Sequence, residues 1–274
     1  MYVDAVEGTS NNDCGQDQRN PCKQLSVAIE RVDSGGIVLI NGDQVLSETI
    51  PLLMDIVITT TQQHRGRIIG HGEVPIAFDV QKEGIILRVR NISFHNIGIA
   101  QISNTIMVFT SNILVTGGYH TVFNVRQRLS KMRLTMSVSN SAFIDTGIVL
   151  DIRGNWLLKL GSSKVNVRDC SFNNTGGMKI YEMKGLLVKI GKCSFHHHLV
   201  RIVSIQKVYR AYVQKSRFVN TSRGEGFLFL GYFVFKSLIA VLMTSTAHRR
   251  VVVCERPRWL LFQFYNANLQ DVTL

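Results

Sequence analysis

Apolar positions recur along this chain in a fixed frame that ends on a phenylalanine. Five segments align without gaps, and each has an apolar residue seven and five positions before that anchor. A spacing of two is the alternation of a β-strand, in which neighbouring side chains point to opposite faces. Two weaker copies end on Val and Ile. The seven anchors are Phe94, Val115, Phe143, Phe172, Phe195, Phe218 and Ile239.

The alternation shifts phase once inside each strong copy. The next inward residue lies two positions before the anchor, which leaves one residue outside the alternation. Asn and Asp tolerate the left-handed backbone that a sharp bend needs. We therefore predict a strand, a tight bend, a second strand and then a loop of variable length in every copy. The predicted bend residues are Asn91, Asn140, Asp169, Lys192 and Lys215.

Successive anchors are 21 to 29 residues apart. A strand–bend–strand unit of this size cannot bury its apolar side alone, but stacked units form a continuous core as a solenoid. The Phe anchor and the Val/Ile columns disfavour a leucine-rich repeat. They favour a right-handed parallel β-helix over residues 37–243, with one coil per copy.

The segments outside the repeat have patterns of their own. In residues 1–36, a helical face is formed by Leu25, Ala28, Ile29 and Val32, and two glycines then end the helix. Residues 244–274 leave the repeat and contain two strand-like stretches, so we interpret them as a tail or a cap.

The repeats resemble those of the pectin-lyase-like right-handed parallel β-helix superfamily. Members of that superfamily often open with a Cys-Gly…Pro-Cys segment and an amphipathic helix that caps the first coil. This chain has Cys14-Gly15 and Pro21-Cys22 before its predicted helix. The resemblance implies an all-β right-handed parallel β-helix with a short N-terminal capping α-helix. It does not assign a function, because the superfamily includes lyases, hydrolases, adhesins and inert scaffolds.

Composition agrees with a folded chain. The 274 residues are 45% hydrophobic and 18% charged, which excludes a disordered protein and allows a sizeable core. The net charge of +12 is unevenly placed. Residues 1–100 carry 8 basic and 12 acidic residues, a net of −4, whereas residues 101–274 carry 23 and 7, a net of +16. The basic part could attract an acidic polymer.

Three features bear on the compartment. Cys14 and Cys22 flank a short polar loop that a disulfide would close in an oxidising environment, although two free surface thiols are the alternative. Sequons for N-glycosylation occur at Asn91, Asn173 and Asn220. The first residues show no signal peptide. We expect an extracellular or cell-surface protein of which this chain is a fragment.

Basic residues at outward positions suggest a binding surface. Stacked coils would bring several of them onto one sheet face, as a ladder for sulfated or carboxylated glycans, although exposed charge also serves solubility. We expect an acidic glycan or a protein as ligand, no nucleic acid, and a monomer. The candidate residues are Arg88, Arg90, Lys164, Arg168, Lys189 and Arg217.

Signals for catalysis are weak. Gly70-His71-Gly72 matches a motif of polygalacturonases, but the aspartate motifs that those hydrolases also need are absent, so His71 is better explained by a turn. A pectate lyase needs an acidic cluster for Ca²⁺, and none is visible. The run 196–198 of three histidines is better explained as a loop than as a zinc site. We expect no cofactor and no metal.

Two further segments leave alternatives open. Cys170 and Cys193 occupy the same inward column in consecutive coils, either as stacked free thiols or as a disulfide, while Cys254 is left unpaired. Residues 227–243 contain one charge in 17 residues and fit either another coil or a membrane span.

The sequence therefore predicts a non-catalytic extracellular or cell-surface scaffold that binds glycan or protein through an exposed sheet face and its loops. One alternative is a polysaccharide lyase or glycoside hydrolase that acts on acidic polysaccharide. The other is the ectodomain fragment of a membrane-anchored protein.

Overall fold

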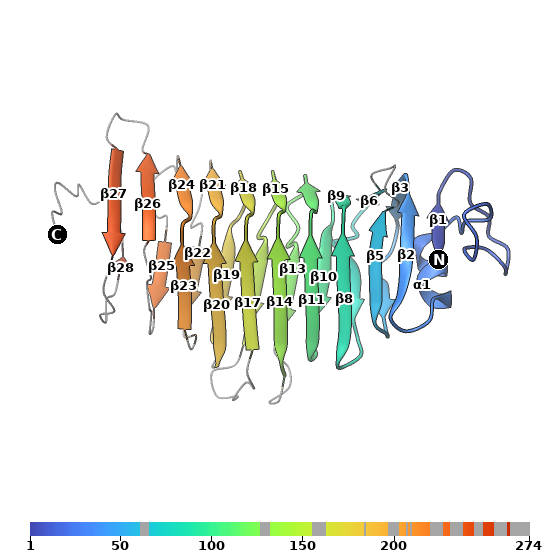
Figure 1. Cartoon of the computed structure of the whole chain (residues 1–274), viewed down its shortest axis with the longest axis horizontal. Coiled ribbons are helices and arrows are strands. Elements are labelled where there is room, and N and C mark those ends of the chain that lie inside the picture. The colour runs from blue at the N-terminus through green and yellow to red at the C-terminus, as the bar shows by residue number, and fades with distance from the viewer. Residues whose placement is uncertain are drawn as a thin grey trace.

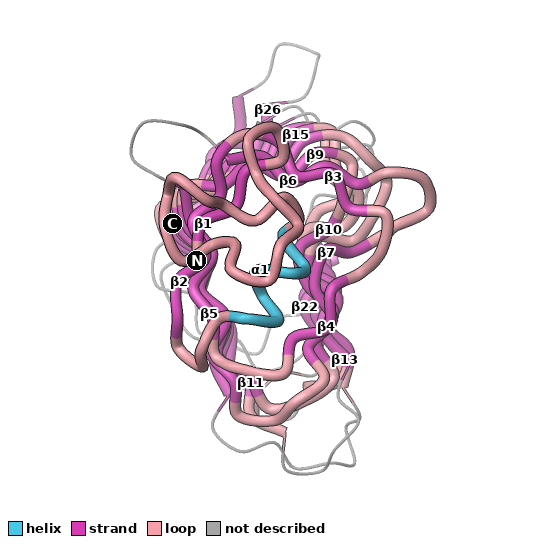
Figure 2. The backbone as a smooth tube through the Cα atoms, turned by 90° about the vertical axis from the view of Figure 1, so that its right-hand side faces the viewer, coloured by secondary structure: helices cyan, strands magenta, loops and turns pink. Residues whose placement is uncertain are grey.

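The chain winds into a parallel β-solenoid built from three long sheets, which Figure 1 shows from the side. We name the sheets A, B and C in the order in which the chain passes through them in each coil. Viewed along the axis, A and C lie on opposite sides of the interior and B joins them (Figure 2). The computed structural model describes residues 1–60, 66–126, 132–154, 163–183, 185–196, 203–206, 208, 210–219, 227–230, 238–243, 249–254 and 262–263.

Sheet A contains the first strand of the six predicted copies that end on Phe94 to Phe218, and all its strands are parallel. The first strand of the copy that ends on Ile239 lies outside the described residues. In these six copies the residues seven and five positions before the anchor alternate inward along the strands and are buried. Its strands are, in spatial order, β1 (Tyr2–Asp4), β2 (Gly36–Asn41), β5 (Ile56–Thr60), β8 (Ile85–Arg90), β11 (Ile106–Ser111), β14 (Leu134–Ser139), β17 (Ser163–Arg168), β20 (Leu186–Gly191) and β23 (Arg210–Gln214).

Sheet B contains the anchors, which pair with one another in register from Phe94 to Phe218. This confirms the alignment of the copies and their stacking. The strands are β3 (Asp43–Leu46), β6 (Gly66–Gly70), β9 (Ile92–His95), β12 (Leu114–Thr116), β15 (Ala142–Ile144), β18 (Ser171–Asn173), β21 (Ser194–His196), β24 (Arg217–Val219), β26 (Leu238–Met243) and β27 (Arg249–Cys254).

Sheet C corrects the prediction that only variable loops follow the anchors. Each coil has a third strand there, and these strands also stack in parallel until the last one. The strands are β4 (Ile50–Leu52), β7 (Ile76–Val80), β10 (Gly98–Ile102), β13 (Phe123–Arg126), β16 (Leu150–Arg153), β19 (Met178–Tyr181), β22 (Val203–Gln206), β25 (Phe227–Leu230) and β28 (Phe262–Gln263).

The predicted bends are confirmed by the backbone. All five bend residues of the strong copies, from Asn91 to Lys215, have φ angles between 49° and 57°, in the left-handed region. A second series of left-handed residues lies two positions after the anchors and turns the chain away from sheet B. Its members are Asn96, Gly117, Asp145 and Asn174. The sequence frame stopped at the anchor and did not predict this second bend.

Stacked aromatic rings fill the interior behind sheet B. Phe172 lies between Phe143 and Phe195, with ring centroids 5.1 Å and 4.5 Å away. All three side chains are fully buried. Rings at this separation contribute beyond the apolar area that they remove from water. The repeat therefore places a phenylalanine in each of these three consecutive coils where it packs on the next.

The N-terminal end carries the helix and a disulfide. Helix α1 (Leu25–Arg31) lies inside the outline of the coils in the axial view and beside β1 and β2 in the side view (Figures 1 and 2). Its residues Leu25, Ala28 and Ile29 are buried, as predicted. Strand β1 was not predicted, and it pairs with β2 at the start of sheet A.

The parallel pattern ends at the C-terminal end of the described chain. Val219 pairs with Met243, so the predicted anchor Ile239 is not opposite Phe218. Strand β27 pairs antiparallel with β26, and β28 pairs antiparallel with β25. Both β27 and β28 belong to the segment 244–274 that was predicted as a tail or a cap. The described parts of 227–243 are strands β25 and β26. Among the described residues, no helix is long and apolar enough to cross a membrane.

Candidate ligand-binding face

Five of the six candidate cations share the outer face of sheet A. Arg88 and Arg90 lie on β8, Lys164 and Arg168 on β17, and Lys189 on β20. Because side chains alternate along a strand, the buried neighbours of these residues fix their outward direction. Arg217 is the exception: it lies on β24 of sheet B, and its side chain is outside the described residues.

Aromatic rings accompany the cations on this face. The guanidinium carbon of Arg88 lies 5.6 Å from the ring centroid of Phe109, its partner in register on β11. The ammonium of Lys189 lies 5.8 Å from the ring of Tyr212, its partner on β23. At these distances the cation is attracted by the face of the ring. The sequence analysis singled out the cations and missed both aromatic partners.

A polar groove of about 400 Å³ lies on the same face between β8 and β14. Its wall combines one guanidinium, one aromatic ring, two amides and several hydroxyl groups. Such a set offers donors for oxyanions, acceptors for hydroxyls, and an apolar surface for stacking. The lining residues are Arg90, Asn91, Phe109, Thr110, Ser111, Asn112, Ser137 and Ser139.

The groove lies between two groups of basic residues. Strand β8 with Arg88 and Arg90 lies on one side, and β17 with Lys164 and Arg168 lies one strand beyond β14 on the other side. The two strands are three pairing steps apart, or about 14 Å. Asp169 lies 4.0 Å from both Arg168 and Lys192, so it offsets only part of this positive charge. The face thus presents positive charge at two separated places along the solenoid axis.

The predicted glycosylation sites have different positions. Asn91 is exposed at the first bend and lines the groove, where its side-chain oxygen accepts a hydrogen bond from Asn112 at 3.2 Å. Asn173 is exposed on β18 of sheet B. Asn220 lies outside the described residues.

His71 occupies an exposed turn after β6. Its backbone N–H donates to the carbonyl of Leu46, and Gly72 has a φ of 67° that favours glycine. Among the histidines of the run 196–198, His196 ends β21 and the other two lie outside the described residues. In the described part of the chain, no three His, Cys, Asp or Glu side chains converge as metal ligands.

Cys170 and Cys193 are free, buried and stacked in one column between Ser141 and Ser216. Each of the four side chains donates to the carbonyl two residues earlier, across the left-handed bend residue. For Cys170 the acceptor is Arg168 at 3.1 Å, and for Ser141 it is Ser139 at 2.6 Å. Contact with Cys193, together with burial, raises the pKa of Cys170 and keeps it protonated. The thiols therefore have a structural role at the bend.

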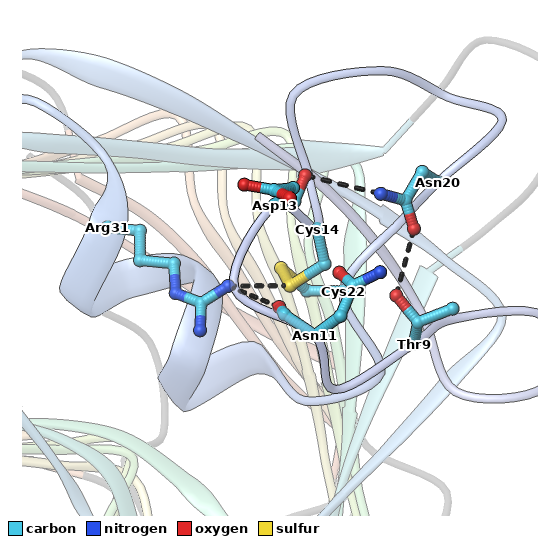
Figure 3. The surroundings of a disulfide bond; sticks show 7 residues. All are labelled: Thr9, Asn11, Asp13, Cys14, Asn20, Cys22 and Arg31. Carbon is cyan, nitrogen blue, oxygen red and sulfur yellow. Dashed lines mark hydrogen bonds between the residues drawn. A yellow bond between two sulfur atoms is a disulfide. The ribbon is translucent and has the colours of Figure 1, made fainter.

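The disulfide predicted between Cys14 and Cys22 is present (Figure 3). Both cysteines are buried, and Arg31 of α1 donates to the sulfur of Cys14 and to the carbonyl of Asn11. The disulfide thus closes the loop of residues 14–22, and Arg31 connects this loop to the helix. Disulfides persist in oxidising compartments.

The sequence analysis missed a buried charge on the outer face of sheet C. The Asp151 carboxylate on β16 accepts hydrogen bonds from Arg126 at 2.9 Å and from Arg153 at 2.9 and 3.1 Å. Burial raises the pKa of Asp151, but the hydrogen bonds and charges of the two arginines outweigh burial and place it below its ordinary value. The carboxyl group is therefore ionised at neutral pH.

A signal for this cluster existed in the sequence. The segments at 123–126, 150–153 and 178–181 read Phe-Asn-Val-Arg, Leu-Asp-Ile-Arg and Met-Lys-Ile-Tyr, which is strand alternation. They start eight, seven and six residues after their anchors. This variable distance hid their alignment from a search for a fixed frame.

No protein-family model matches this chain, and no curated protein matches it.

Proposed function

We propose that this chain is a non-catalytic β-helix of the right-handed, pectin-lyase-like type that binds an acidic glycan along the outer face of sheet A. The observation that carries the proposal is the polar groove beside Phe109, which has basic residues on both sides. We further propose an extracellular or cell-surface location, which the disulfide between Cys14 and Cys22 supports.

The chemistry of the groove suits a charged sugar polymer. Arg90 can donate two parallel hydrogen bonds to a carboxylate or sulfate group. Ser111, Ser137 and Ser139 can exchange hydrogen bonds with sugar hydroxyls, and Phe109 supplies a flat apolar surface. An extended chain along the axis would meet the cations of β8 and then those of β17, about 14 Å away.

The composition of the groove favours binding over hydrolysis. Glycoside hydrolysis generally uses a pair of carboxyl groups on either side of the scissile bond. Among the described residues that line the groove, none is Asp, Glu or His. His71 belongs to a turn after β6 in sheet B rather than to this face.

The test is binding of the chain to heparin and polygalacturonate, measured by titration at low and moderate salt. We expect Arg90→Ala to weaken binding about tenfold, because a charge-assisted contact is lost. Raising the salt concentration should weaken binding by the wild type, since the cations are exposed. The same titrations should be followed for product release, with and without Ca²⁺.

Arg67→Ala is the matched control, because it removes the same charge from an exposed arginine on sheet B, where Arg67 pairs with Asp43. It should bind almost as well as the wild type. Equal losses of polymer affinity in Arg67→Ala and Arg90→Ala would show that only net charge matters. That result would refute the groove as the binding site. If the wild type released products and His71→Ala did not, the chain would instead be an enzyme.

A further inference from the structure

The outer face of sheet C holds a charge cluster that has no part in the proposed glycan site. Asp151 lies on this face because its strand neighbours Leu150 and Ile152 are buried in the interior. Sheet C is on the opposite side of the solenoid from sheet A (Figure 2). A ligand in the groove of sheet A would not reach it.

The cluster contains more positive charge than its carboxylate requires. One arginine would neutralise Asp151, but Arg126 of β13 and Arg153 of β16 both contact it. Lys179 of β19 is the partner of Asp151 in register on the following coil. These three cations and one carboxylate give the site a net charge of about +2, which complements a dianion.

Asp151 holds the two guanidinium groups in fixed orientations. Its side chain is only 4% exposed, and Arg153 approaches it with two parallel N–H groups. Arg126 is tied further by weaker contacts of its guanidinium with the backbone carbonyls of Val125 and Asp151. A group that is already ordered loses less conformational entropy when a ligand binds.

The arginines still have donors that face solvent. Each guanidinium has five N–H groups, and the carboxylate uses only some of them. The side chain of Arg126 is 34% exposed and that of Arg153 is 53% exposed. The remaining donors are therefore accessible from outside the sheet.

We infer that Arg126 and Arg153 form a binding site for a tetrahedral oxyanion of the sulfate type, with Lys179 beside it. Asp151 is the positioning residue: it does not touch the ligand but fixes the two guanidinium groups that do.

Equilibrium dialysis of the full chain against radiolabelled inorganic sulfate at constant ionic strength tests this site. We expect one saturable equivalent per chain. Arg153→Ala should weaken sulfate binding about tenfold or more. Arg153→Lys should also lose most of it, because an ammonium keeps the charge but not the planar fork.

Asp151→Asn separates positioning from charge. This variant makes the cluster more positive by one unit, so a purely electrostatic patch would bind sulfate more tightly. Loss of the carboxylate should instead release the guanidinium groups and weaken binding. If this variant does not fold, as judged by its far-ultraviolet circular dichroism, the comparison of Arg153→Lys with Arg153→Ala decides.

Arg67→Ala is again the matched control and should retain the sulfate site. The inference is wrong if no saturable site exists, if Arg153→Lys binds like the wild type, or if Asp151→Asn binds more tightly. These outcomes are independent of the glycan site. Arg90→Ala should weaken polymer binding but not sulfate binding. Arg153→Ala should weaken sulfate binding but leave the contribution of Arg90 to polymer binding unchanged.

Discussion

The outer faces of sheets A and C are both basic, but they hold their cations differently. On sheet A, Arg88 and Lys189 lie over aromatic rings, and Arg90 is exposed beside an open groove. On sheet C, Arg126 and Arg153 are tied to a carboxylate that is almost fully buried. The first arrangement leaves side chains adaptable, and the second fixes them.

This difference teaches that net charge alone does not describe a binding surface. An adaptable face can follow a long and irregular polymer, and exposed charges make its binding sensitive to salt. A fixed pair of guanidinium groups suits one small anion of defined shape. Both faces are formed by coils that share one stacked interior, so the stability of that interior is the standard against which effects on either face are compared.

The largest expected effect comes from removing that common support. Phe172→Ala should lower the free energy of unfolding by about 3–5 kcal/mol, because the ring is fully buried between two others and its loss leaves a cavity. Urea unfolding followed by circular dichroism measures this change. Phe109→Ala on the outer face of sheet A is the matched control and should cost about 1 kcal/mol or less. Similar losses in the two variants would contradict the assigned interior.

A smaller effect, of about 2 kcal/mol, is expected for Asp151→Asn at neutral pH, because the charge-assisted hydrogen bonds to the buried carboxylate are lost while the partly exposed guanidinium groups stay hydrated. The folded-state pKa of Asp151 lies below the unfolded value of about 3.9. Its contribution is therefore complete above about pH 4 and is lost as pH falls through the folded-state pKa. Unfolding free energies of wild type and variant should converge in acid.

Asp43→Asn on sheet B supplies the control for this titration. Asp43 forms an exposed pair with Arg67, and such a pair contributes little because solvent screens the two charges. Its difference from the wild type should stay small at every pH. A difference between wild type and Asp151→Asn that is as large at pH 3 as at pH 7 would rule out the buried ion pair as its source.

The smallest effect on stability is expected in the buried column that contains Cys170 and Cys193, which belongs to neither outer face. The double variant Cys170→Ser, Cys193→Ser should change stability by only about 1 kcal/mol, because Ser141 and Ser216 make the same bond at the equivalent bends. Cys170→Val should cost more, since the carbonyl of Arg168 then keeps only the backbone N–H of Asn140 as a donor. Thermal unfolding compares the three proteins. A serine variant as unstable as the valine variant would contradict this role.

Much of the fold could be predicted because apolar positions and bend residues recur in the sequence once per coil. Each strong copy has an inward Phe anchor, two inward residues seven and five positions before it and a bend residue, and sheets A and B keep these at fixed offsets. A local steric preference placed Asn91, Asn140 and Asp169 at the bends, and their φ angles confirm it. The hand of the coils stays a prediction from the resemblance.

The third sheet could not be predicted in this way. Its strands begin at different distances from the anchors, because the connecting turns differ in length. The arginines and Asp151 of this sheet therefore seemed unrelated in the sequence. By contrast, Arg88 and Phe109 both lie six positions before their anchors, so the fixed frame already contained this pair. The sequence analysis missed it because it considered only the cations at outward positions.

The sequence by itself determined the coil, its interior columns and its first bend, since these depend on hydrophobic period and local backbone preference. Only the tertiary structure decided which outward residues of sheet C become neighbours. Residues such as Asp151 and Arg126 are 25 positions apart in the chain and meet because consecutive coils stack in register. Register depends on the packing of every coil on the next, and that is a property of the whole solenoid.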